Sequence, residues 1–460
     1  MVIILELSNF LSLFSFMTSD IEKSIELINN PINSFAWGWP TIALISLTGI
    51  VLMIGLRFMP IIRIPYGFKS LISDSNPSDE GDITPFQALM TSLSATIGTG
   101  NIAGVATAIA VGGPGAIFWM WLISLFGIAT KYAEAVLAVK YREVDSLGNY
   151  IGGPMYYIKN GLGNSWKWLG FLFAFFGVLA GFGIGNGVQS FEVSSALYTF
   201  GVPKIFTGVL LGILVFIVII GGVKRIAKAA SAIVPTMALL YIVACILILL
   251  LNINQLPNAF ATIFSNAFTG KAAAGGTFAQ VVLMGFKRGI FSNEAGLGSA
   301  PIAHASAKTN NPIKQGSVAM LGTFIDTIII CSMTALVIIT TGAYQTGQSG
   351  SNLSITAFNS VLPGSGFLVT IGLVLFAFTT VLGWSYYGEK CTEYIFGTKA
   401  ILPFRLVWVA VVVFGAIAGD RGFVWAIADT LNGLMALPNL VALLLTYQSV
   451  VAVPQTNLQC

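Results

Sequence analysis

The sequence has few charged residues and a single histidine. Asp, Glu, Lys and Arg make up 9% of its 460 residues, whereas a soluble domain carries about 25%. Hydrophobic residues make up 56% and the mean hydropathy is +0.86, so we expect a polytopic all-α membrane protein. Because His304 is the only histidine, a metal centre with several histidine ligands is excluded. The four cysteines have no metal-ligand spacing and suggest no disulfide framework.

Chemistry-bearing motifs are also scarce. The sequence offers no adjacent nucleophile–base pair, metal-ligand cluster or phosphate-binding loop, which argues against an intramembrane enzyme. We expect no organic cofactor and no nucleic-acid partner, and we expect the protein to be embedded in the lipid bilayer.

Long apolar runs dominate what is present. They predict about eleven membrane-spanning helices, at residues 37–58, 84–111, 114–139, 166–200, 203–222, 230–251, 276–305, 316–343, 363–395, 401–418 and 422–447. Residues 1–36 are expected to form an amphipathic interfacial helix with Asp20 as an N-cap. Glu6 and the lack of a basic start or cleavage site argue against a signal peptide.

Lysines and arginines predict the orientation. If the loop between the first two segments is cytoplasmic, most of the 22 basic residues fall on that side. Lys23, Lys204, Lys271 and Arg421 fall on the other side, and Lys287 and Arg288 fall within a segment. We therefore expect a multi-pass plasma-membrane protein with its N-terminus outside and its C-terminus in the cytoplasm.

The segment 84–111 is interrupted at its centre by Ser94-Ala95-Thr96-Ile97-Gly98-Thr99-Gly100-Asn101-Ile102-Ala103-Gly104. Glycines weaken the helix there, and Thr96, Thr99 and Asn101 bring polar groups to the expected midplane. Freed backbone groups cost several kcal/mol each in hydrocarbon, so a break must line a cavity. The alternative is an unbroken helix in which Gly100 and Gly104 allow close helix packing.

A second interruption, Gly289-Ile290-Phe291-Ser292-Asn293-Glu294-Ala295-Gly296-Leu297-Gly298, lies in the segment 276–305. If 37–58 is a peripheral helix, the two breaks fall in the first helix of two five-helix halves with opposite topology. This pattern predicts an inverted-repeat transporter whose broken helices form the substrate site. The halves are residues 84–251 and 276–448, and residues 449–460 form a tail.

The motifs around these breaks resemble the alanine/glycine:cation symporter family of the amino acid–polyamine–organocation superfamily. They comprise residues 91–105 and 291–300, Gly112-Gly113-Pro114-Gly115-Ala116 and Gly152-Gly153-Pro154-Met155-Tyr156-Tyr157. The resemblance runs from about Asp82 to the last span and implies the leucine-transporter type of five-plus-five fold. It also implies a sodium site made by the Ser94, Ile97 and Phe376 carbonyls and the Thr379 and Thr380 hydroxyls.

The substrate of such a protein is an amino acid zwitterion. The second half of the first broken helix begins at the break, so the N–H groups of Thr99, Gly100 and Asn101 are candidates for its carboxylate. Carbonyls around Phe291 are candidates for its ammonium group. A side chain added at Gly100 is expected to clash with the ligand and to disfavour the required backbone. The predicted contacts also include Thr96, Ser292 and Thr380.

Helix faces suggest further contacts. Trp384 lies four residues after Thr380, and an indole there would limit room to alanine and glycine; the alternative is a core tryptophan. Phe182, Asn186 and Gln189 share one α-helical face. The two amides are predicted to contact the substrate, with interhelical hydrogen bonding as the alternative.

Glu294 and Asp326 are ionisable groups at membrane depth. We expect either neutralisation by Lys287 and Arg288 or a proton-coupling role, and His304 is expected to be structural. The leading hypothesis is a sodium-coupled symporter of alanine and glycine that works by alternating access. The alternative is a proton-coupled amino-acid symporter of the same fold. Paired broken helices favour a closed central site over a channel.

Overall fold

A computed structural model describes residues 23–72, 78–269, 277–418 and 422–452. Most of these residues are helical, and strands among them are confined to one hairpin and one isolated bridge. Eight helices of the described residues are long and apolar enough to cross a membrane. A ninth crossing arises if the bent pair Pro85–Thr96 and Gly100–Gly112 is one span.

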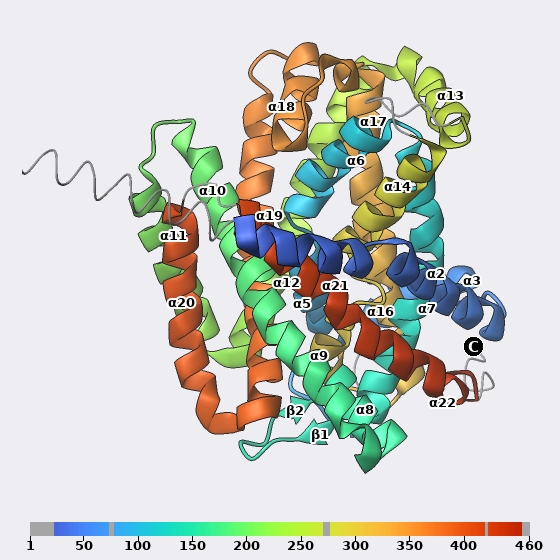
Figure 1. Cartoon of the computed structure of the whole chain (residues 1–460), viewed down its shortest axis with the longest axis vertical. Helices are drawn as coiled ribbons and strands as arrows, with labels where there is room; N and C mark the ends of the chain where they lie inside the picture. Colours follow the sequence, from blue (N-terminus) through green and yellow to red (C-terminus); the bar gives the residue numbers. More distant parts are fainter. Residues whose placement is uncertain (1–22, 73–77, 270–276, 419–421, 453–460) are drawn as a thin grey trace, which may run out of the picture.

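The described chain begins with a helix that runs from Lys23 to Gly55 and turns at Trp37 and Gly38. We call residues 23–55 the N-terminal arm; its second part is α2 (Trp39–Gly55). In Figure 1 the blue arm crosses the front of the bundle beside α21 (Gly422–Leu445). The short helices α3 (Met59–Ile62) and α4 (Ile64–Ile72) follow it. Asp20 lies outside the described residues.

The first group of crossing helices starts with the predicted break. Helix α5 (Pro85–Thr96) begins at a capping box, in which Thr84 and Gln87 exchange hydrogen bonds of 3.0 and 3.1 Å. Its axis differs by 55° from that of the following half-helix. That half-helix and the rest of the group are the π-helical η1 (Gly100–Gly104), α6 (Val105–Gly112), α7 (Ala116–Lys140), α9 (Lys167–Ala180), the π-helical η3 (Gly181–Gly187), α10 (Val188–Tyr198), α11 (Lys204–Ile219) and α12 (Gly222–Leu251).

The connection between α7 and α9 carries the only strand pair among the described residues. Strands β1 (Glu143–Val144) and β2 (Tyr150–Ile151) are antiparallel, with Glu143 opposite Ile151. Helices α8 (Pro154–Leu162) and η2 (Asn164–Trp166) complete the connection. We call this side of the bundle the hairpin end.

The second group also contains an interruption, because α14 (Phe278–Asn293) stops before α15 (Ala300–Ala305) begins. The remaining elements are η4 (Ile253–Gln255), α13 (Leu256–Ala267), α16 (Pro312–Thr323), the π-helical η5 (Phe324–Cys331), α17 (Ser332–Thr340), η6 (Ala343–Thr346), α18 (Gly350–Val361), α19 (Gly366–Phe396), η7 (Thr398–Ala400), α20 (Ile401–Ile417) and α22 (Tyr447–Val451).

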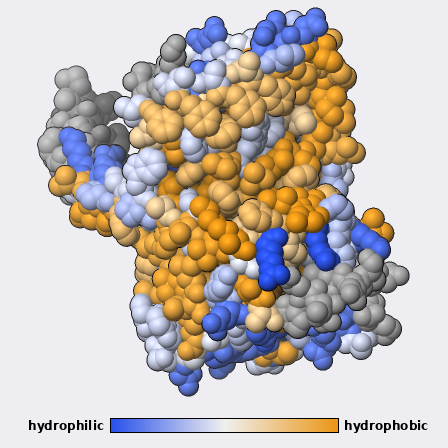
Figure 2. Space-filling model, turned by 90° about the vertical axis from the view of Figure 1, so that its right-hand side faces the viewer, coloured by the Kyte–Doolittle hydropathy of each residue, from blue (hydrophilic) through white to orange (hydrophobic). Residues whose placement is uncertain are grey.

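The two ends of the bundle differ in what covers them. Figure 1 places α13 and α18 at one end, which we call the α18 end, and β1, β2 and α8 at the other. Figure 2 shows apolar side chains over much of one face, with hydrophilic residues gathered toward the two ends. Exposed apolar residues also follow α11 and α12, including Ile213, Leu239 and Leu247. This distribution suits lipid around the middle of the bundle.

Eleven crossings remain a prediction. The expected segment 203–222 contains α11, whose 16 residues are shorter than the other spans. The expected segment 276–305 is divided between α14 and α15. The two interruptions predicted at Gly98 and after Phe291 are present.

Candidate functional site

The break in the first helix is held open by one side chain. In a continuous α-helix the Gly98 N–H would donate to the Ser94 carbonyl. It donates instead to Asn101 Oδ1 at 2.9 Å. Likewise the Asn101 N–H donates to the Gly98 carbonyl at 3.2 Å rather than to the Ile97 carbonyl. The Ser94 and Ile97 carbonyls thereby lose their helical partners, and both belong to the predicted sodium set.

The other end of the Asn101 amide reaches the second group of helices. Its Nδ2 donates to Asp326 Oδ1 at 2.7 Å. Ser292 Oγ donates to Asp326 Oδ2 at 2.8 Å, and Asn101 is completely buried. Asn101 and Ser292 were both predicted to contact the substrate. Their side chains instead join the two broken helices through Asp326.

Four of the five predicted sodium ligands lie together where α5 and α19 touch. Thr380 Oγ1 lies 3.4 Å from the Ile97 carbonyl oxygen and 3.0 Å from that of Phe376. Thr379 Oγ1 also lies 3.0 Å from the Phe376 oxygen. The helices approach closely because α19 carries glycine at 383, where a Cβ would lie 2.7 Å from Ser94 Oγ. The Ile97 and Phe376 carbonyls and the Thr379 and Thr380 hydroxyls come from two helices and carry no full charge, which suits a monovalent cation.

The side-chain amides of Asn186 in η3 and Gln189 in α10 differ in their hydrogen bonds. Asn186 Nδ2 donates to the Trp408 carbonyl of α20 at 2.8 Å, as the interhelical alternative predicted. Gln189 Oε1 is buried and accepts no hydrogen bond from a described residue. It lies 3.7 Å from where a Cβ on Gly98 would be. Gln189 therefore points at the break.

The prediction that Phe182, Asn186 and Gln189 share one α-helical face was wrong, because residues 181–187 form a π-helix. The wider turn rotates later residues relative to earlier ones. Phe182 and Asn186 consequently face α20, where the Phe182 ring lies 5.4 Å from that of Trp408.

The break in the second group frees another carbonyl. The Ala295 N–H would continue α14 by donating to the Phe291 carbonyl, but it donates to Asn293 Oδ1 at 2.9 Å. Glu294 sits at the turn with a φ of 57°, in the left-handed region. The Phe291 carbonyl is thus available near the first break, as the prediction for the ammonium group required.

Gly98, rather than Gly100, is the tightly packed glycine of the break. A Cβ on Gly98 would lie 2.6 Å from Thr380 Oγ1. One on Gly100 would meet the Phe291 ring at 3.5 Å, an ordinary contact, and the φ of Gly100 lies outside the left-handed region. The expected backbone constraint at Gly100 was therefore wrong. A Cβ on Gly104 would meet no described atom within 4 Å, which removes the close-packing alternative at that position.

Thr96 and Thr99, which flank the first break, differ in whether their polar groups are free to bind a ligand. Thr96 Oγ1 lies 3.3 Å from the Ser92 carbonyl and 3.4 Å from that of Leu93, so it bonds within its own helix. Thr99 is buried at the start of the second half-helix. Since the Asn101 N–H is already used, the N–H groups of Thr99 and Gly100 are the remaining candidates for a carboxylate.

Trp384 lies at the junction of three crossing helices. Its Nε1 donates to Glu294 Oε1 at 3.0 Å, which ties α19 to the second break. Its indole packs on the glycine-rich η3, where a Cβ on Gly185 would lie 2.3 Å from Trp384 Cβ. The side chain is 1% exposed. These contacts fix the indole beside the break.

Comparisons with known proteins agree with this geometry. The sequence profile of the sodium:alanine symporter family matches residues 22–458. The sodium/alanine symporter AgcS of Methanococcus maripaludis is 53% identical over 424 residues, which cover 90% of this chain and 93% of AgcS. This chain belongs to the sodium:alanine symporter family. It is therefore a multi-pass secondary transporter of amino acids rather than an enzyme.

Two further likenesses concern substrate and fold. The probable sodium/glutamine symporter GlnT of Bacillus subtilis is 40% identical, with 92% of this chain and 89% of GlnT covered. The structure of MhsT in complex with L-phenylalanine matches with a TM-score of 0.57 at 16% identity, over 81% of this chain and 99% of MhsT. At that identity the likeness shows the fold alone, which is the predicted leucine-transporter type.

Charges buried in this symporter are paired differently from the prediction. Neutralisation of Glu294 and Asp326 by Lys287 and Arg288 was wrong, because Lys287 Nζ pairs with Asp429 of α21 at 3.1 Å. The guanidinium of Arg288 lies 5.8 Å from the Phe291 ring centre. Lys287 and Arg288 thus face the α18 side of the break.

Lys131 of α7 is buried and interacts electrostatically with the carboxylates of Glu134, Glu294 and Asp326, although its Nζ donates no hydrogen bond to a described residue. Lys131 and Glu134 lie in the apolar segment 114–139, so sequence reasoning had a signal for them and missed it. Glu134 Oε1 accepts hydrogen bonds from the Gly296 N–H at 3.1 Å and Asn439 Nδ2 at 2.7 Å. It therefore stabilises the unwound chain after α14.

At the hairpin end the two broken helices of the symporter are joined. The Asp82 and Ile83 N–H groups donate to the Ser306 carbonyl at 2.9 and 3.2 Å, and the Lys308 N–H donates to Ile83 at 2.6 Å. Burial raises the pKa of Asp82, whose Oδ2 accepts the Tyr150 N–H at 2.7 Å. The chain entering α5 and the chain leaving α15 therefore form one layer.

Arg142 fastens this layer, and sequence reasoning missed it because it follows a helix among other basic residues. Its guanidinium donates to the carbonyls of Ala305, Ala307, Glu80 and Thr309 at 3.1, 2.8, 3.0 and 2.9 Å. The contacts span both segments. This arrangement ties the two segments together at the hairpin end.

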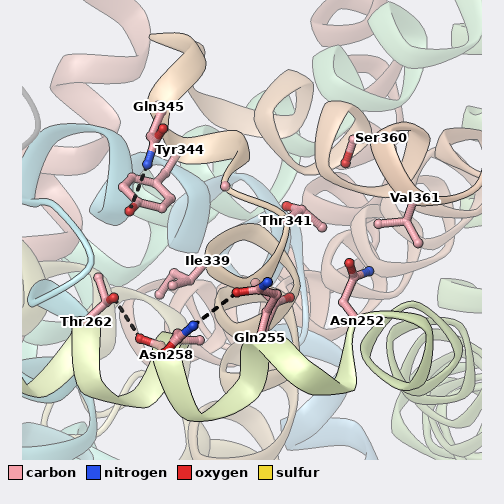
Figure 3. A pocket seen from close by; sticks show the side chains of 13 residues that line it. Asn252, Gln255, Asn258, Thr262, Ile339, Thr341, Tyr344, Gln345, Ser360 and Val361 are labelled. Carbon is pink, nitrogen blue, oxygen red and sulfur yellow. Dashed lines mark hydrogen bonds between the residues drawn. The ribbon is translucent and has the colours of Figure 1, made fainter.

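A cavity at the α18 end lies away from these breaks. It encloses about 500 Å³ between α13, η6 and α18. Figure 3 shows its amide and hydroxyl side chains, among them Asn258, Gln255 and Tyr344, with hydrogen bonds between neighbours. Its lining residues carry no charge, and none belongs to the predicted site.

Proposed function

We propose that this chain carries alanine and glycine across the plasma membrane together with sodium, by alternating access. The observation that carries the proposal is the meeting of the Ile97 and Phe376 carbonyls at Thr380, with Thr379 beside it. The break leaves the Ser94 and Ile97 carbonyls without helical partners, so a cation can satisfy them. Sodium binding would then stabilise the broken shape that the substrate needs.

The amino acid would lie between the two breaks. The N–H groups of Thr99 and Gly100 face its carboxylate from a half-helix N-terminus. Gln189 Oε1 and the Phe291 carbonyl accept hydrogen bonds from its ammonium group. Both oxygens are at hand because Gln189 Oε1 is unpartnered among the described residues and Phe291 has lost its helical donor.

Trp384 would set the size limit. Its indole is fixed by Glu294 and by the packing on Gly185, so it cannot move aside cheaply for a larger side chain. Relatives in this family are named for both alanine and glutamine. The choice of alanine and glycine therefore rests on this side chain and not on family membership.

Both buried carboxylates near the breaks are engaged by hydrogen-bond donors of the protein. Glu294 accepts hydrogen bonds from the Trp384 N–H and the Ser299 hydroxyl. Asp326 accepts three, from Asn101, Ser292 and Thr327. Donors of this kind favour the ionised carboxylate, whereas burial at membrane depth favours the protonated one. The preference for sodium therefore rests on the uncharged oxygens that meet at Thr380 and not on these carboxylates.

The proposal extends to topology. We propose that the N-terminus lies outside and the C-terminus in the cytoplasm, which puts the hairpin end and Arg142 on the cytoplasmic side. We also propose that residues 84–251 and 276–448 are the inverted halves, with 37–58 as an added peripheral helix. Closure by Arg142 would then block release of substrate into the cell.

The test replaces Thr379 and Thr380 together with Val and titrates alanine binding with sodium. Valine has nearly the shape of threonine but lacks the hydroxyl oxygen, so the double variant loses two sodium ligands. Contacts to a charged group contribute about 1.5–3 kcal/mol. The sodium concentration at half-maximal alanine binding should therefore rise about 10- to 100-fold. Thr392→Val is the matched control, because Thr392 is buried on the same helix and bonds only its own Gly388 carbonyl at 2.8 Å. An unchanged midpoint in the double variant would refute the site. Alanine uptake into vesicles that persists without sodium under a proton gradient would favour the proton-coupled alternative.

A further inference from the structure

The N-terminal arm touches the transporter core at Asp429 of α21. Trp37 Nε1 donates to the Asp429 carbonyl at 2.7 Å. Asn33 Nδ2 donates to Asp429 Oδ2 at 3.3 Å and to Thr430 Oγ1 at 2.8 Å. Trp37 is 3% exposed. The arm therefore grips one turn of α21 through both backbone and side chain.

The same tryptophan also contacts α14. Lys287 Nζ lies 5.4 Å from the Trp37 ring centre and 3.1 Å from Asp429 Oδ2. The Trp37 and Phe291 ring centres are 6.3 Å apart, a distance typical of aromatic pairs. Trp37 thus sits at the junction of α14 and α21, against the ion pair that joins them and against a residue of the candidate substrate site.

A cavity of about 270 Å³ lies beside this junction, between η3, α10, α14 and α21. Its lining residues are Ile184, Val188, Arg288, Phe291, Ala426 and Asp429. Two of these, Phe291 and Asp429, are the residues that Trp37 contacts. Separation of α14 from α21 would widen the cavity and would have to break the contacts of Trp37.

The fit at the turn of the arm is close. A Cβ on Gly433 of α21 would lie 2.9 Å from the Ala36 carbonyl oxygen and from Trp37 Nε1. By contrast Trp39, two residues further along the same arm, is 47% exposed. The burial of Trp37 therefore reflects its contacts with the core and not a general property of tryptophans in the arm.

We propose that Trp37 is a positioning residue of the transport cycle, and that the N-terminal arm braces the gate that α14 and α21 form above Phe291. Asn33 assists by holding the Asp429 carboxylate toward Lys287. The inference rests on the proposed function in one respect: the cavity must be the path by which substrate reaches the break from the α18 side. The arm is then a working part of the transporter although it lies outside the ten helices of the predicted repeats.

The experiment measures the opening of the gate without substrate. Ala426 lines the cavity, so Ala426→Cys provides a site for a water-soluble maleimide in purified detergent-solubilised protein. Cys460, which lies outside the described residues, is replaced with Ser throughout, and the remaining cysteines Cys245, Cys331 and Cys391 are buried. Labelling of this parent without Ala426→Cys gives the background. Trp37→Ala should speed labelling about tenfold and Trp37→Phe, which keeps a ring but loses the N–H, about threefold, as expected for one hydrogen bond and one aromatic contact. Trp39→Ala is the matched control and should label at the parental rate.

A merely structural role predicts a different result: Trp37→Ala would lower the melting temperature and leave labelling well below that temperature unchanged. Asn33→Ala is a second variant, which removes both amide contacts and keeps Trp37, and it should also speed labelling. Parental labelling rates in folded Trp37→Ala, or in Asn33→Ala where Trp37→Ala does not fold, would overturn the proposal. Failure of the parent to bind alanine with sodium would refute the proposed function instead, whatever the labelling rates are.

Discussion

Replacing Gly98 with alanine tests the first helix break by sterics alone. The φ of Gly98 lies outside the left-handed region, so alanine can adopt its backbone. The added Cβ would lie 2.6 Å from Thr380 Oγ1 and 3.6 Å from Thr380 Cβ. Real Cβ contacts are almost never shorter than about 3.0 Å, so the hydroxyl must move by several tenths of an ångström. Such overpacking costs about 1–3 kcal/mol.

Because the displaced oxygen belongs to the proposed sodium set, this cost should fall on the sodium-bound state. We expect the sodium midpoint for alanine binding to rise about 5- to 150-fold in Gly98→Ala, the equivalent of ~1–3 kcal/mol. Gly104→Ala is the control, since its Cβ would meet no described atom within 4 Å. The assay is alanine binding by purified protein over a sodium series, with the melting temperature measured on the same preparation.

A double variant separates packing from ligation. Thr380→Ala removes the clashing oxygen and leaves the nearest Thr380 atom at 3.6 Å from the new methyl group. Gly98→Ala/Thr380→Ala should therefore recover thermal stability relative to Gly98→Ala and should not recover the sodium midpoint. Recovery of both would mean that Thr380 is only a packing residue. An unchanged midpoint in Gly98→Ala alone would refute the cation site at this break.

Two further predictions concern selectivity and gating. Trp384→Ala should let larger aliphatic amino acids bind, since it removes an indole fixed beside the break; competition against labelled alanine measures this, and an unchanged profile in folded protein would place Trp384 outside the pocket. Arg142→Lys keeps the charge and loses the fork that spans Ala305 and Glu80. Hydrogen–deuterium exchange of peptides covering 80–84 and 305–310 should rise about tenfold, for the loss of one to two hydrogen bonds. Lys140→Ala, at the exposed end of α7 just before Arg142, should leave the exchange unchanged.

The positions of both helix breaks could be predicted from the sequence because the cause is local. Glycines next to Asn101 and after Phe291 stand in otherwise apolar runs, and polar groups at that depth need partners. The identity of those partners could not be predicted. Asp326 lies 225 residues from Asn101, and Asp429 lies 142 residues from Lys287. Sequence proximity pointed instead to Lys287 as the partner of Glu294.

The prediction from helix periodicity was wrong for a different reason. An α-helical count put Asn186 and Gln189 on one face, and the π-helix over 181–187 turned them apart. Its glycines carry no side chain that resists the wider turn, and Gly185 leaves space for Trp384. The signal was present as four alternating glycines, but their consequence depends on what packs against them. The position of Gln189 Oε1 beside the break follows from the fold and not from its sequence spacing.

The breaks persist because side chains of the protein, and not only ligands, take over the lost helical hydrogen bonds. Asn101 supplies an acceptor to Gly98 and a donor to Asp326, and Asn293 supplies an acceptor to Ala295. In each case the side chain satisfies the N–H group of the break and leaves the carbonyl partner of that N–H free. The carbonyls freed in this way are acceptors that suit cations and ammonium groups, while the N–H groups of Thr99 and Gly100 remain the candidate donors for a carboxylate. The side-chain hydrogen bonds explain how an apolar bundle can hold an unwound backbone without substrate, and the groups left free support the proposed binding of a sodium ion and a zwitterion between the two breaks.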